Sequence, residues 1–166
     1  AVRMGSASAG ARPARAVSPV HLPNANVFLI HSALGQTWAD NTYATLMTGV
    51  SWRTASIQMF GRRIPSPRLT AWVGDHAYTY SHLTWPPAPW STTMHAIRQR
   101  VEDLTGTSFN GVLLNLYRDG RDSMGWHSDD EPELGRKPVI ASLSLGAPRR
   151  FVFRALKNHA HKFRLT

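Results

Sequence analysis

The sequence predicts a mainly β (α+β) domain, in which two helices lie on one side of an antiparallel sandwich or barrel. Two segments in the first two thirds of the chain have the apolar spacing of helices, and short apolar runs of strand length follow them. The chain has 166 residues, of which 42% are apolar. This length and composition are typical of one folded domain with a substantial core.

Two helices are expected, over residues 34–50 and between Ser91 and Gly106. In the first, apolar side chains fall on or near one face: Leu34, Trp38, Leu46, Met47 and Val50. In the second, apolar residues recur at spacings of three, four and three: Met94, Ile97, Val101 and Leu104. Ser91 is suited to cap the helix N-terminus and Gly106 to end the helix, because serine accepts free amide hydrogens and glycine adopts left-handed backbone angles.

Strands are expected in the segments 26–30, 55–60, 77–83, 111–117, 138–146, 150–154 and 162–166. The basic, proline-rich residues 61–68 and the WPPAPW residues 85–90 are expected to be loops. Residues 111–117 alternate between two faces, one with Val112, Leu114 and Leu116 and the other with Leu113, Asn115 and Tyr117. The first face is apolar and the second carries two hydrogen-bonding groups, so we expect one face on the core and one on a polar cavity.

The chain is strongly basic, with a net charge of +9, and it contains no cysteine. Residues 1–74 carry +6, residues 75–133 carry −5 and residues 134–166 carry +8. This balance indicates a polyanionic partner such as nucleic acid, and a soluble basic surface explains it equally well. The lack of cysteine excludes a disulfide framework and thiolate metal sites, and it fits an intracellular protein.

Residues 1–25 are expected to form a flexible arm before a domain over residues 26–166. The first twenty residues are rich in Ala, Ser, Arg and Pro and contain no acidic residue, a composition that favours disorder. No run approaches the ~18 apolar residues that cross a bilayer, so no membrane association is expected.

The segment DSMGWHSDDEPELG, residues 122–135, places His127 and Asp129 two positions apart in an acidic cluster. In an extended chain, residues i and i+2 point the same way, so an imidazole nitrogen and a carboxylate oxygen can reach one ion. Such a pair suits Fe(II) in a two-histidine, one-carboxylate site, and it also suits the start of a catalytic zinc site. The structural alternative is a polar turn with a solvated acidic face. Trp126 is expected to pack over the ion and shield it.

Three segments carry a family resemblance: MFGRRIPSPR (59–68), PRLTAWVGDHAYTYSHL (67–83) and TGTSFNGVLLNLYRDGRDSMGWHSDDEPELGRKPVIASLSLGAPRRFVFR (105–154). They resemble the AlkB family of Fe(II)- and 2-oxoglutarate-dependent dioxygenases, most of all the branches represented by human AlkB homologues two and three. The resemblance covers about residues 26–166. It implies a double-stranded β-helix (jelly roll) with an N-terminal α/β extension.

The resemblance also implies roles for individual residues. His127 and Asp129 match two iron ligands, and Asn115 and Tyr117 match residues that hold 2-oxoglutarate. Five residues match substrate-binding positions: Tyr78 and Tyr80 in a segment that encloses a flipped base, Glu131 at the damaged base, and Phe60 and Arg68 in a hairpin or loop that probes the nucleic-acid stack.

The implied reaction is oxidative demethylation of N-alkylated bases in DNA, or in RNA, with Fe(II), 2-oxoglutarate and O2. It releases formaldehyde, succinate and CO2. The expected partner is alkylated nucleic acid, and the expected state is a monomer. The expected location is the cytoplasm of a bacterium, or the nucleus or an organelle of a eukaryote.

The family pattern also requires a second histidine ligand several dozen residues after Asp129 and two C-terminal arginines that serve 2-oxoglutarate. His159 and His161 lack the expected placement. The domain is therefore expected to be C-terminally incomplete, without its last strands and its third ligand. The alternative function is a non-catalytic, basic nucleic-acid-binding protein with a degenerate or truncated metal site.

Overall fold

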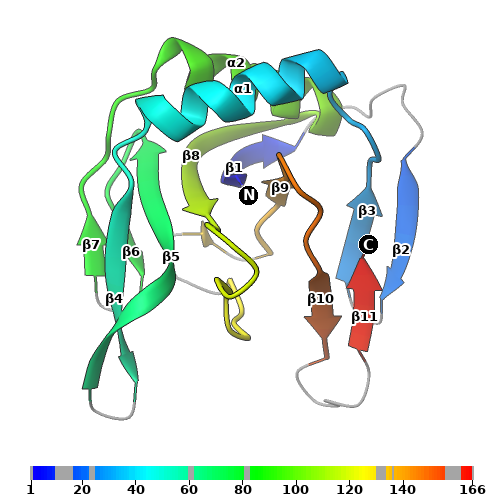
Figure 1. Cartoon of the computed structure of the whole chain (residues 1–166). Coiled ribbons are helices and arrows are strands. Elements are labelled where there is room, and N and C mark those ends of the chain that lie inside the picture. Colours follow the sequence, from blue (N-terminus) through cyan, green and yellow to red (C-terminus); the bar gives the residue numbers. More distant parts are fainter. Residues whose placement is uncertain are drawn as a thin grey trace. The chain divides into compact units, whose positions relative to one another are not determined.

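The computed structural model describes residues 2–9, 17–22, 25–59, 62–80, 83–129, 134–135, 137–155 and 162–165. The elements in chain order are β1 (Val2–Ala9), β2 (Ser18–Leu22), β3 (Ala25–Leu29), α1 (Gln36–Gly49), β4 (Arg53–Met59), β5 (Arg62–Gly74), β6 (Tyr78–Tyr80), β7 (Leu83–Trp85), α2 (Thr92–Thr105), β8 (Thr107–Leu116), β9 (Ile140–Leu143), β10 (Phe151–Arg154) and β11 (Lys162–Leu165) (Figure 1). The chain divides into one compact unit of residues 1–13 and 44–144 and another of residues 14–43 and 145–166. The described fold is mainly β with two helices, as predicted.

A five-stranded antiparallel sheet forms the centre of the larger unit, in the order β4-β5-β8-β1-β9. The neighbouring strands β5 and β8 share one apolar face, where Ala71 lies opposite Leu114 and Val73 opposite Val112. These four side chains are at most 9% exposed. On the other face, Thr70 lies opposite Asn115. The predicted alternation over residues 111–117 is therefore confirmed, and the face with Asn115 is called the polar face below.

Helix α2 packs against β8 and begins and ends where the sequence predicts. The Ser91 side chain accepts a hydrogen bond from the Met94 amide at 3.2 Å. Gly106 has φ 63° and donates its N–H to the Glu102 carbonyl, which closes the last turn. The buried side of the helix carries Met94, Ile97 and Val101, which are at most 6% exposed. The Glu102 carboxylate accepts a hydrogen bond from the Phe109 amide at 2.8 Å, so the helix is also tied to the start of β8.

Strand β5 contradicts the loop predicted for residues 61–68, because the strand runs from Arg62 to Gly74. Prolines interrupt sheet ladders, and this segment contains Pro65 and Pro67. The ladder between β5 and β8 starts at Leu69, beyond both prolines, and the pairing with the edge strand β4 is irregular near them. The prolines are therefore tolerated because they lie outside the central ladder.

Strands also occur in the segment where the sequence predicts a flexible arm, residues 1–25. Residues 2–9 form β1, which pairs with both β8 and β9, and residues 18–22 form β2, which pairs with β3. A segment rich in Ala, Ser and Gly has little intrinsic strand preference. The backbone of β1 instead gains order from its ladders with β8 and β9, about a hundred residues or more away, which local sequence patterns do not reveal.

The remaining strands form hairpins. The strand predicted over residues 77–83 is a hairpin of β6 and β7, in which the Thr79 and Thr84 hydroxyls lie 3.2 Å apart. In the smaller unit, β2 pairs with β3 and β10 with β11. Gly146 has φ 78°, and a Cβ there would stand 3.2 Å from the Tyr43 ring.

Within the described ranges, the five-stranded sheet does not close into a barrel. No helix of this part is long and apolar enough to cross a membrane.

Candidate functional site

His127 and Asp129 face each other in the segment after β8. His127 Nε2 and Asp129 Oδ1 are 3.5 Å apart, and the two side chains are 27% and 13% exposed. The other imidazole nitrogen, Nδ1, is 2.9 Å from the Gly125 carbonyl oxygen. Because a carbonyl oxygen only accepts, Nδ1 carries the hydrogen, and in the neutral ring the lone pair is on Nε2. The structure thus directs an unprotonated nitrogen and a carboxylate oxygen to the same place.

This pair fits two neighbouring ligands of one metal ion. Ligand atoms at ~2.1 Å from an ion are separated by ~3.0–3.4 Å at octahedral or tetrahedral angles, close to the observed distance. A backbone carbonyl on the second ring nitrogen is also typical of metal-binding histidines. Within the part of the chain that the structure describes, no group of three or more His, Cys, Asp or Glu side chains is placed to hold an ion. His159 and His161 lie outside that part.

Asn115 and Arg68 meet on the polar face of the sheet. Arg68 Nε donates a hydrogen bond to Asn115 Oδ1 at 2.7 Å, and the two residues are 6% and 7% exposed. Tyr117 directly follows the end of β8 and is half-buried. Of the two residues expected to hold 2-oxoglutarate, Asn115 therefore shares this face with an arginine from the neighbouring strand.

The resemblance places Arg68 in a hairpin or loop that probes nucleic acid, and in the structure Arg68 lies in β5, which pairs with β4 as a hairpin. Arg68 belongs to β5, where Pro65 and Pro67 are exposed and Ser66 and Arg68 are buried. This alternation turns the arginine side chain inward, toward Asn115. Arg68 is thus placed beside the candidate cosubstrate residues.

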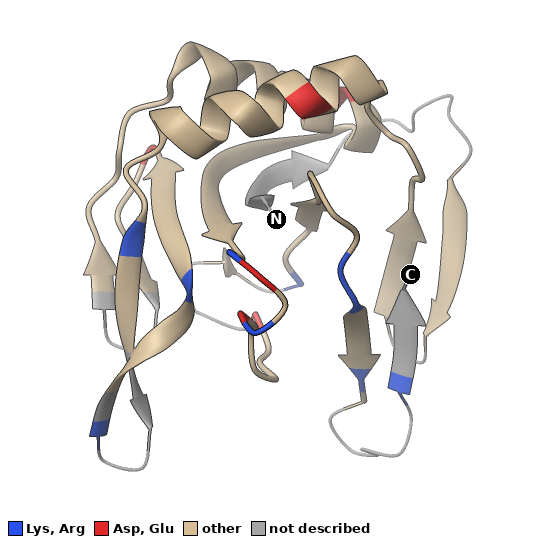
Figure 2. Ribbon diagram, in the orientation of Figure 1, with Lys and Arg blue, Asp and Glu red and all other residues tan. Residues whose placement is uncertain are grey.

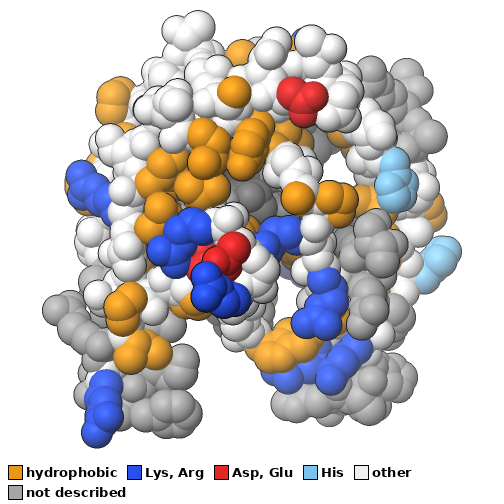
Figure 3. Space-filling view, in the orientation of Figure 1, with side chains coloured by type: hydrophobic (Ala, Val, Ile, Leu, Met, Phe, Trp, Pro, Cys, Tyr) orange, Lys and Arg blue, Asp and Glu red, His pale blue; other side chains and the backbone are white. Residues whose placement is uncertain are grey.

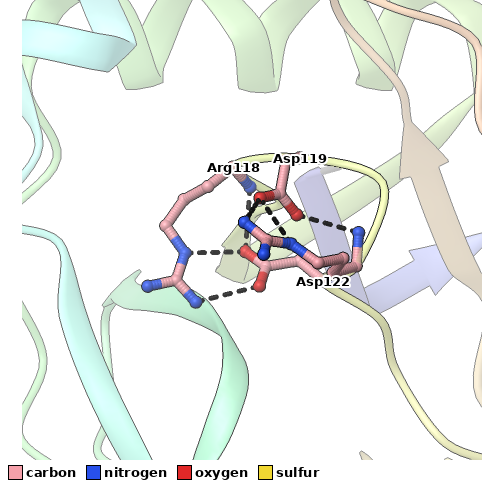
Figure 4. Close-up of polar contacts among 4 residues, drawn as sticks. Arg118, Asp119 and Asp122 are labelled. Carbon is pink, nitrogen blue, oxygen red and sulfur yellow. Dashed lines mark hydrogen bonds and ion pairs between the residues drawn. The ribbon is translucent and has the colours of Figure 1, made fainter.

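The loop between β8 and His127 contains a charge cluster that was not predicted from the sequence. Figure 2 shows that the ribbon directly after β8 is alternately basic and acidic. Arg118 donates from its backbone N, Nε and Nη2 to the two carboxylate oxygens of Asp122, at 2.8–2.9 Å (Figure 4). Arg121 makes a similar set of bonds to Asp119, at 2.8–3.2 Å. In the sequence, the alternation of Arg and Asp at spacings of two and four residues could have predicted these ion pairs.

The two ion pairs differ in burial. The Asp122 side chain is 8% exposed and that of Asp119 is 45% exposed, whereas the two arginine side chains are 53% and 93% exposed. Hydrogen bonds from Arg121 lower the pKa of the Asp119 carboxyl below its usual value of 3.8, and the hydrogen bonds to Asp122 raise the pKa of Arg118. The four side chains line an open hollow of about 300 Å³. In the space-filling view, basic and acidic side chains lie against one another in the middle of this face (Figure 3).

The same loop is attached to β5. The Ser123 amide donates to the Pro67 carbonyl at 2.9 Å, next to Arg68 in the sequence. The loop that leads to His127 is therefore held at one end by the Arg118–Asp122 pair and by this backbone bond. These contacts limit where the chain can place His127 and Asp129.

Tyr78 is a buried aromatic that stacks on Trp72. The ring centroids are 4.6 Å apart with an interplanar angle of 22°, and Tyr78 is 8% exposed. Trp72 Nε1 donates to the His76 carbonyl at 2.8 Å. A Cβ on Gly111 would stand 2.5 Å from the Trp72 ring, so the indole lies directly over this glycine. The ring of Tyr78 is therefore part of a packed aromatic pair on β5 and β6.

For three of the expected substrate residues, the side-chain position is not described. Tyr80 lies in β6 with its backbone opposite Leu83. Phe60 and Glu131 lie outside the described residues. Trp126 corrects another expectation, since it is 52% exposed and does not form a buried shield over the His127 and Asp129 pair. Residues 123–129 belong to no helix or strand of their own.

Comparison with known proteins identifies the family. The family model described as the 2OG-Fe(II) oxygenase superfamily matches residues 26–166. The chain is 55% identical over 89 residues to human alpha-ketoglutarate-dependent dioxygenase alkB homolog 3, a match that covers 53% of this chain and 31% of that protein. The bovine protein of the same name is 46% identical over 117 residues, which cover 70% of this chain and 41% of the relative.

A second group of relatives carries the name DNA oxidative demethylase ALKBH2. The human protein is 44% identical over 125 residues, which cover 72% of this chain and 48% of that protein. The matched region thus spans from about a third to about half of each of these relatives. The match of the family model over most of the sequence, together with these identities, shows that the chain belongs to the 2OG-Fe(II) oxygenase superfamily and, within it, to the AlkB family.

Proposed function

We propose that this chain belongs to an enzyme that oxidatively removes alkyl groups from N-alkylated bases in DNA, with Fe(II), 2-oxoglutarate and O2. The observation that carries the proposal is the His127–Asp129 pair at 3.5 Å, with its imidazole oriented by Gly125. The comparisons also support the proposal, because the chain is similar to proteins named alpha-ketoglutarate-dependent dioxygenase and DNA oxidative demethylase. RNA with the same base lesions is a further candidate substrate.

In this proposal His127 and Asp129 hold the iron. The Gly125 carbonyl keeps the proton on Nδ1 and so keeps Nε2 free to bind. Asn115 and Tyr117 orient 2-oxoglutarate through their amide and hydroxyl groups. When bound, iron and 2-oxoglutarate supply the oxidising chemistry, in which O2 is consumed and succinate and CO2 are released.

The proposed substrate residues come from β6 and its surroundings. A base must leave its stack to reach the iron, at a cost of a few kcal/mol, and stacking on an aromatic side chain returns ~1–3 kcal/mol. Tyr78 and Tyr80 are proposed to enclose the base. Glu131 is proposed to contact its edge and Phe60 the neighbouring stack. The packing of Tyr78 on Trp72 supports a rigid rather than a mobile wall.

We also propose that the five-stranded sheet is one wall of a double-stranded β-helix. The support is the division of its central strands into an apolar face and a polar face with Asn115. In such a fold the apolar face rests on the helices, and the polar face lines the reaction cavity.

The test uses the whole protein, loaded with Fe(II) and 2-oxoglutarate in air, and a single-stranded oligonucleotide containing 1-methyladenine. We expect formaldehyde, succinate and unmodified adenine to form in equal amounts. His127→Ala should abolish all three products, whereas His21→Ala, a change at an exposed histidine in β2, should leave turnover unchanged. A duplex and an RNA of the same sequence, assayed in parallel, rank the substrates.

The competing function is binding of nucleic acid without catalysis, which the net charge of +9 favours. It predicts salt-sensitive binding of unmodified oligonucleotides that is the same in wild type and His127→Ala, with no succinate formed. That combination of results would reject the demethylase proposal.

A further inference from the structure

The hairpin of β6 and β7 is too small to hold its shape alone. Each of its strands has three residues, and Tyr78 lies opposite Trp85 at its open end. An isolated two-stranded hairpin is only marginally stable in water. Tyr78 is nevertheless 8% exposed, so it is packed against its surroundings. Other parts of the larger unit must therefore hold the hairpin in place.

Trp72 supports the first strand of the hairpin from the polar face of the sheet. Because Ala71 and Val73 lie on the apolar face, Trp72 between them points to the polar face. Its ring stacks on that of Tyr78 with centroids 4.6 Å apart, and its Nε1 donates to the His76 carbonyl at 2.8 Å. One indole thus contacts both β6 and the connection that precedes it.

Two glycines give this indole a flat support. Gly74 and Gly111 lie opposite each other in the β5–β8 ladder. A Cβ on Gly111 would stand 2.5 Å from the Trp72 ring, and a Cβ on Gly74 would stand 3.1 Å from it. A glycine inside a strand often marks a place where another group approaches the backbone closely. The backbone, the indole and the Tyr78 ring are therefore layered, which fixes the height of Tyr78 above the sheet.

The second leg of the hairpin is anchored through the residues that follow β7. The Ala88 N–H donates to the Trp72 carbonyl at 3.4 Å, and the Ala88 carbonyl accepts from the Gly74 N–H at 3.2 Å. Trp90 Nε1 donates to Asp75 Oδ1 at 2.8 Å, which joins this connection to the one before β6. Both connections of the hairpin are therefore fixed at the end of β5.

Trp90 is itself held against helix α2. The guanidinium carbon of Arg98 lies 4.9 Å from the centroid of the Trp90 ring, and the centroid of the His95 ring lies 5.9 Å from it. A guanidinium over an indole is an attractive contact. Arg98 Nε donates to Glu102 Oε1 at 3.0 Å, and the same oxygen accepts from the Phe109 amide. The hairpin is thus connected to the helix and to the start of β8.

We propose that Trp72 and Trp90 are positioning residues, which hold the β6–β7 hairpin as a preformed wall for the alkylated base. The inference rests on the proposed function, in which this hairpin encloses the base. Gly111, beneath the indole, and Asn115 lie on the same face of β8, ~13 Å apart along the strand. The wall therefore shares a face of the sheet with Asn115. A preformed wall favours binding, because the hairpin does not have to be ordered when the substrate arrives.

A purely structural role for the two tryptophans is the alternative. In that case their replacement lowers the stability of the whole fold and weakens the binding of every ligand alike. A positioning role instead affects the hairpin and the nucleic-acid substrate, and it leaves the binding of 2-oxoglutarate unchanged. The KM values for the two substrates therefore separate the two roles.

The experiment uses the whole protein with Fe(II), 2-oxoglutarate and a single-stranded oligonucleotide containing 1-methyladenine. Trp72→Leu removes the stacked ring and the N–H donor, whereas Trp72→Phe and Trp90→Phe keep an aromatic ring and remove only the donor. Trp52→Phe is the matched control, because Trp52 Nε1 donates to the Leu46 carbonyl at 3.2 Å, between α1 and β4. Steady-state kinetics give the KM for each substrate, and hydrogen exchange with mass spectrometry reports on the amides of the hairpin.

We expect Trp72→Leu to raise the KM for the oligonucleotide ~10-fold, and Trp72→Phe and Trp90→Phe to raise it a few-fold, because the wall is misplaced. The KM for 2-oxoglutarate should stay within about twofold of wild type in every variant. The amides of β6 and β7 should exchange faster in Trp72→Leu, whereas those of α2 and β8 keep their rates. Trp52→Phe should match wild type in all three measurements.

Three outcomes would overturn the inference. In the first, the KM values for both substrates rise together, or Trp52→Phe acts like Trp72→Phe, which assigns the tryptophans a general structural role. In the second, the amides of β6 and β7 exchange at the wild-type rate in every variant, so neither tryptophan holds the hairpin. In the third, these amides exchange faster while the KM for the oligonucleotide is unchanged, so the hairpin is not a wall of the substrate site.

The inference and the proposed function can fail separately. If the whole protein shows no turnover, binding of the same oligonucleotide is measured by fluorescence anisotropy. Faster exchange of the hairpin and weaker binding in Trp72→Leu, with neither in Trp52→Phe, would then support the positioning role while the demethylase proposal fails. If the protein demethylates the oligonucleotide and every variant keeps the wild-type KM and exchange rates, the demethylase proposal stands and the positioning role fails.

Discussion

Asp122 accepts three hydrogen bonds from one residue, Arg118. The donors are the backbone N, Nε and Nη2, at 2.9, 2.8 and 2.9 Å. The same loop holds a second pair of this kind, Arg121 with Asp119, whose side chains are much more exposed. The loop therefore contains two ion pairs of the same chemistry, one with a buried carboxylate and one with an exposed carboxylate, and each can serve as the control for the other.

Removal of the buried carboxylate charge should destabilise the chain more than removal of the exposed one. Asp122→Asn retains the shape but weakens three bonds to a group that is 6% exposed. We expect its unfolding temperature to fall by about 2–4 °C, measured by circular dichroism. Asp119→Asn should change it little, because exposed ion pairs contribute little. Equal effects of the two substitutions would show that the Arg118–Asp122 pair does not hold the loop.

Acidic pH should remove the small contribution that the Asp119 carboxylate makes to the stability of the fold. Its folded pKa lies below the usual 3.8, so its contribution to stability is present above the unfolded pKa and is lost as pH falls through the folded pKa. The unfolding free energy of wild type should therefore fall slightly more than that of Asp119→Asn between about pH 4 and pH 2.5. Urea unfolding across this range measures the difference. Parallel curves for the two proteins would contradict the lowered pKa.

Gly111 should not tolerate a side chain. A Cβ there would stand 2.5 Å from the Trp72 ring, which is held by stacking on Tyr78 and by its bond to His76. Gly111→Ala should therefore lower the unfolding free energy by about 1–3 kcal/mol, as overpacking does. Gly120→Ala is the control, since nothing lies within 4 Å of its added Cβ. If urea unfolding gives the same value for both variants, the indole is not fixed over Gly111.

The N-terminus of α2 should depend on the Ser91 side chain. Ser91→Ala removes the oxygen that accepts from the Met94 amide, and we expect a loss of about 1 kcal/mol in urea unfolding. Thr92→Ala, at the exposed first residue of the helix, should be neutral or slightly stabilising. If Thr92→Ala lowers the free energy of unfolding as much as Ser91→Ala does, the Ser91 side chain makes no specific contribution as the helix cap.

The elements that depend on residues close together in the sequence could be predicted from the sequence. The cap at Ser91, the left-handed Gly106 and the apolar spacing between them are all present in α2. The alternation over residues 111–117 predicted the two faces of β8, because a strand with one face on a core must alternate. The placement of His127 beside Asp129 also followed from their spacing of two residues.

Long-range pairing and burial could not be predicted in this way. The sequence of β1 resembles a disordered arm, and only its ladders with β8 and β9 make it a strand. Arg68 looked like an exposed cation of a proline-rich loop, because nothing local shows that β5 continues through Pro65 and Pro67. The Arg68–Asn115 bond joins residues 47 positions apart, so the place of Arg68 on the polar face became visible only in the folded chain.

We propose that His127 and Asp129 hold the iron of a 2-oxoglutarate-dependent oxygenase. The most direct measurement is anaerobic titration of Fe(II) into the whole protein, followed by 2-oxoglutarate, with the visible charge-transfer absorption as readout. We predict one iron per chain and an absorption band on addition of 2-oxoglutarate for wild type, and neither for His127→Ala or Asp129→Ala. The same iron binding and the same band in both variants would contradict the claim.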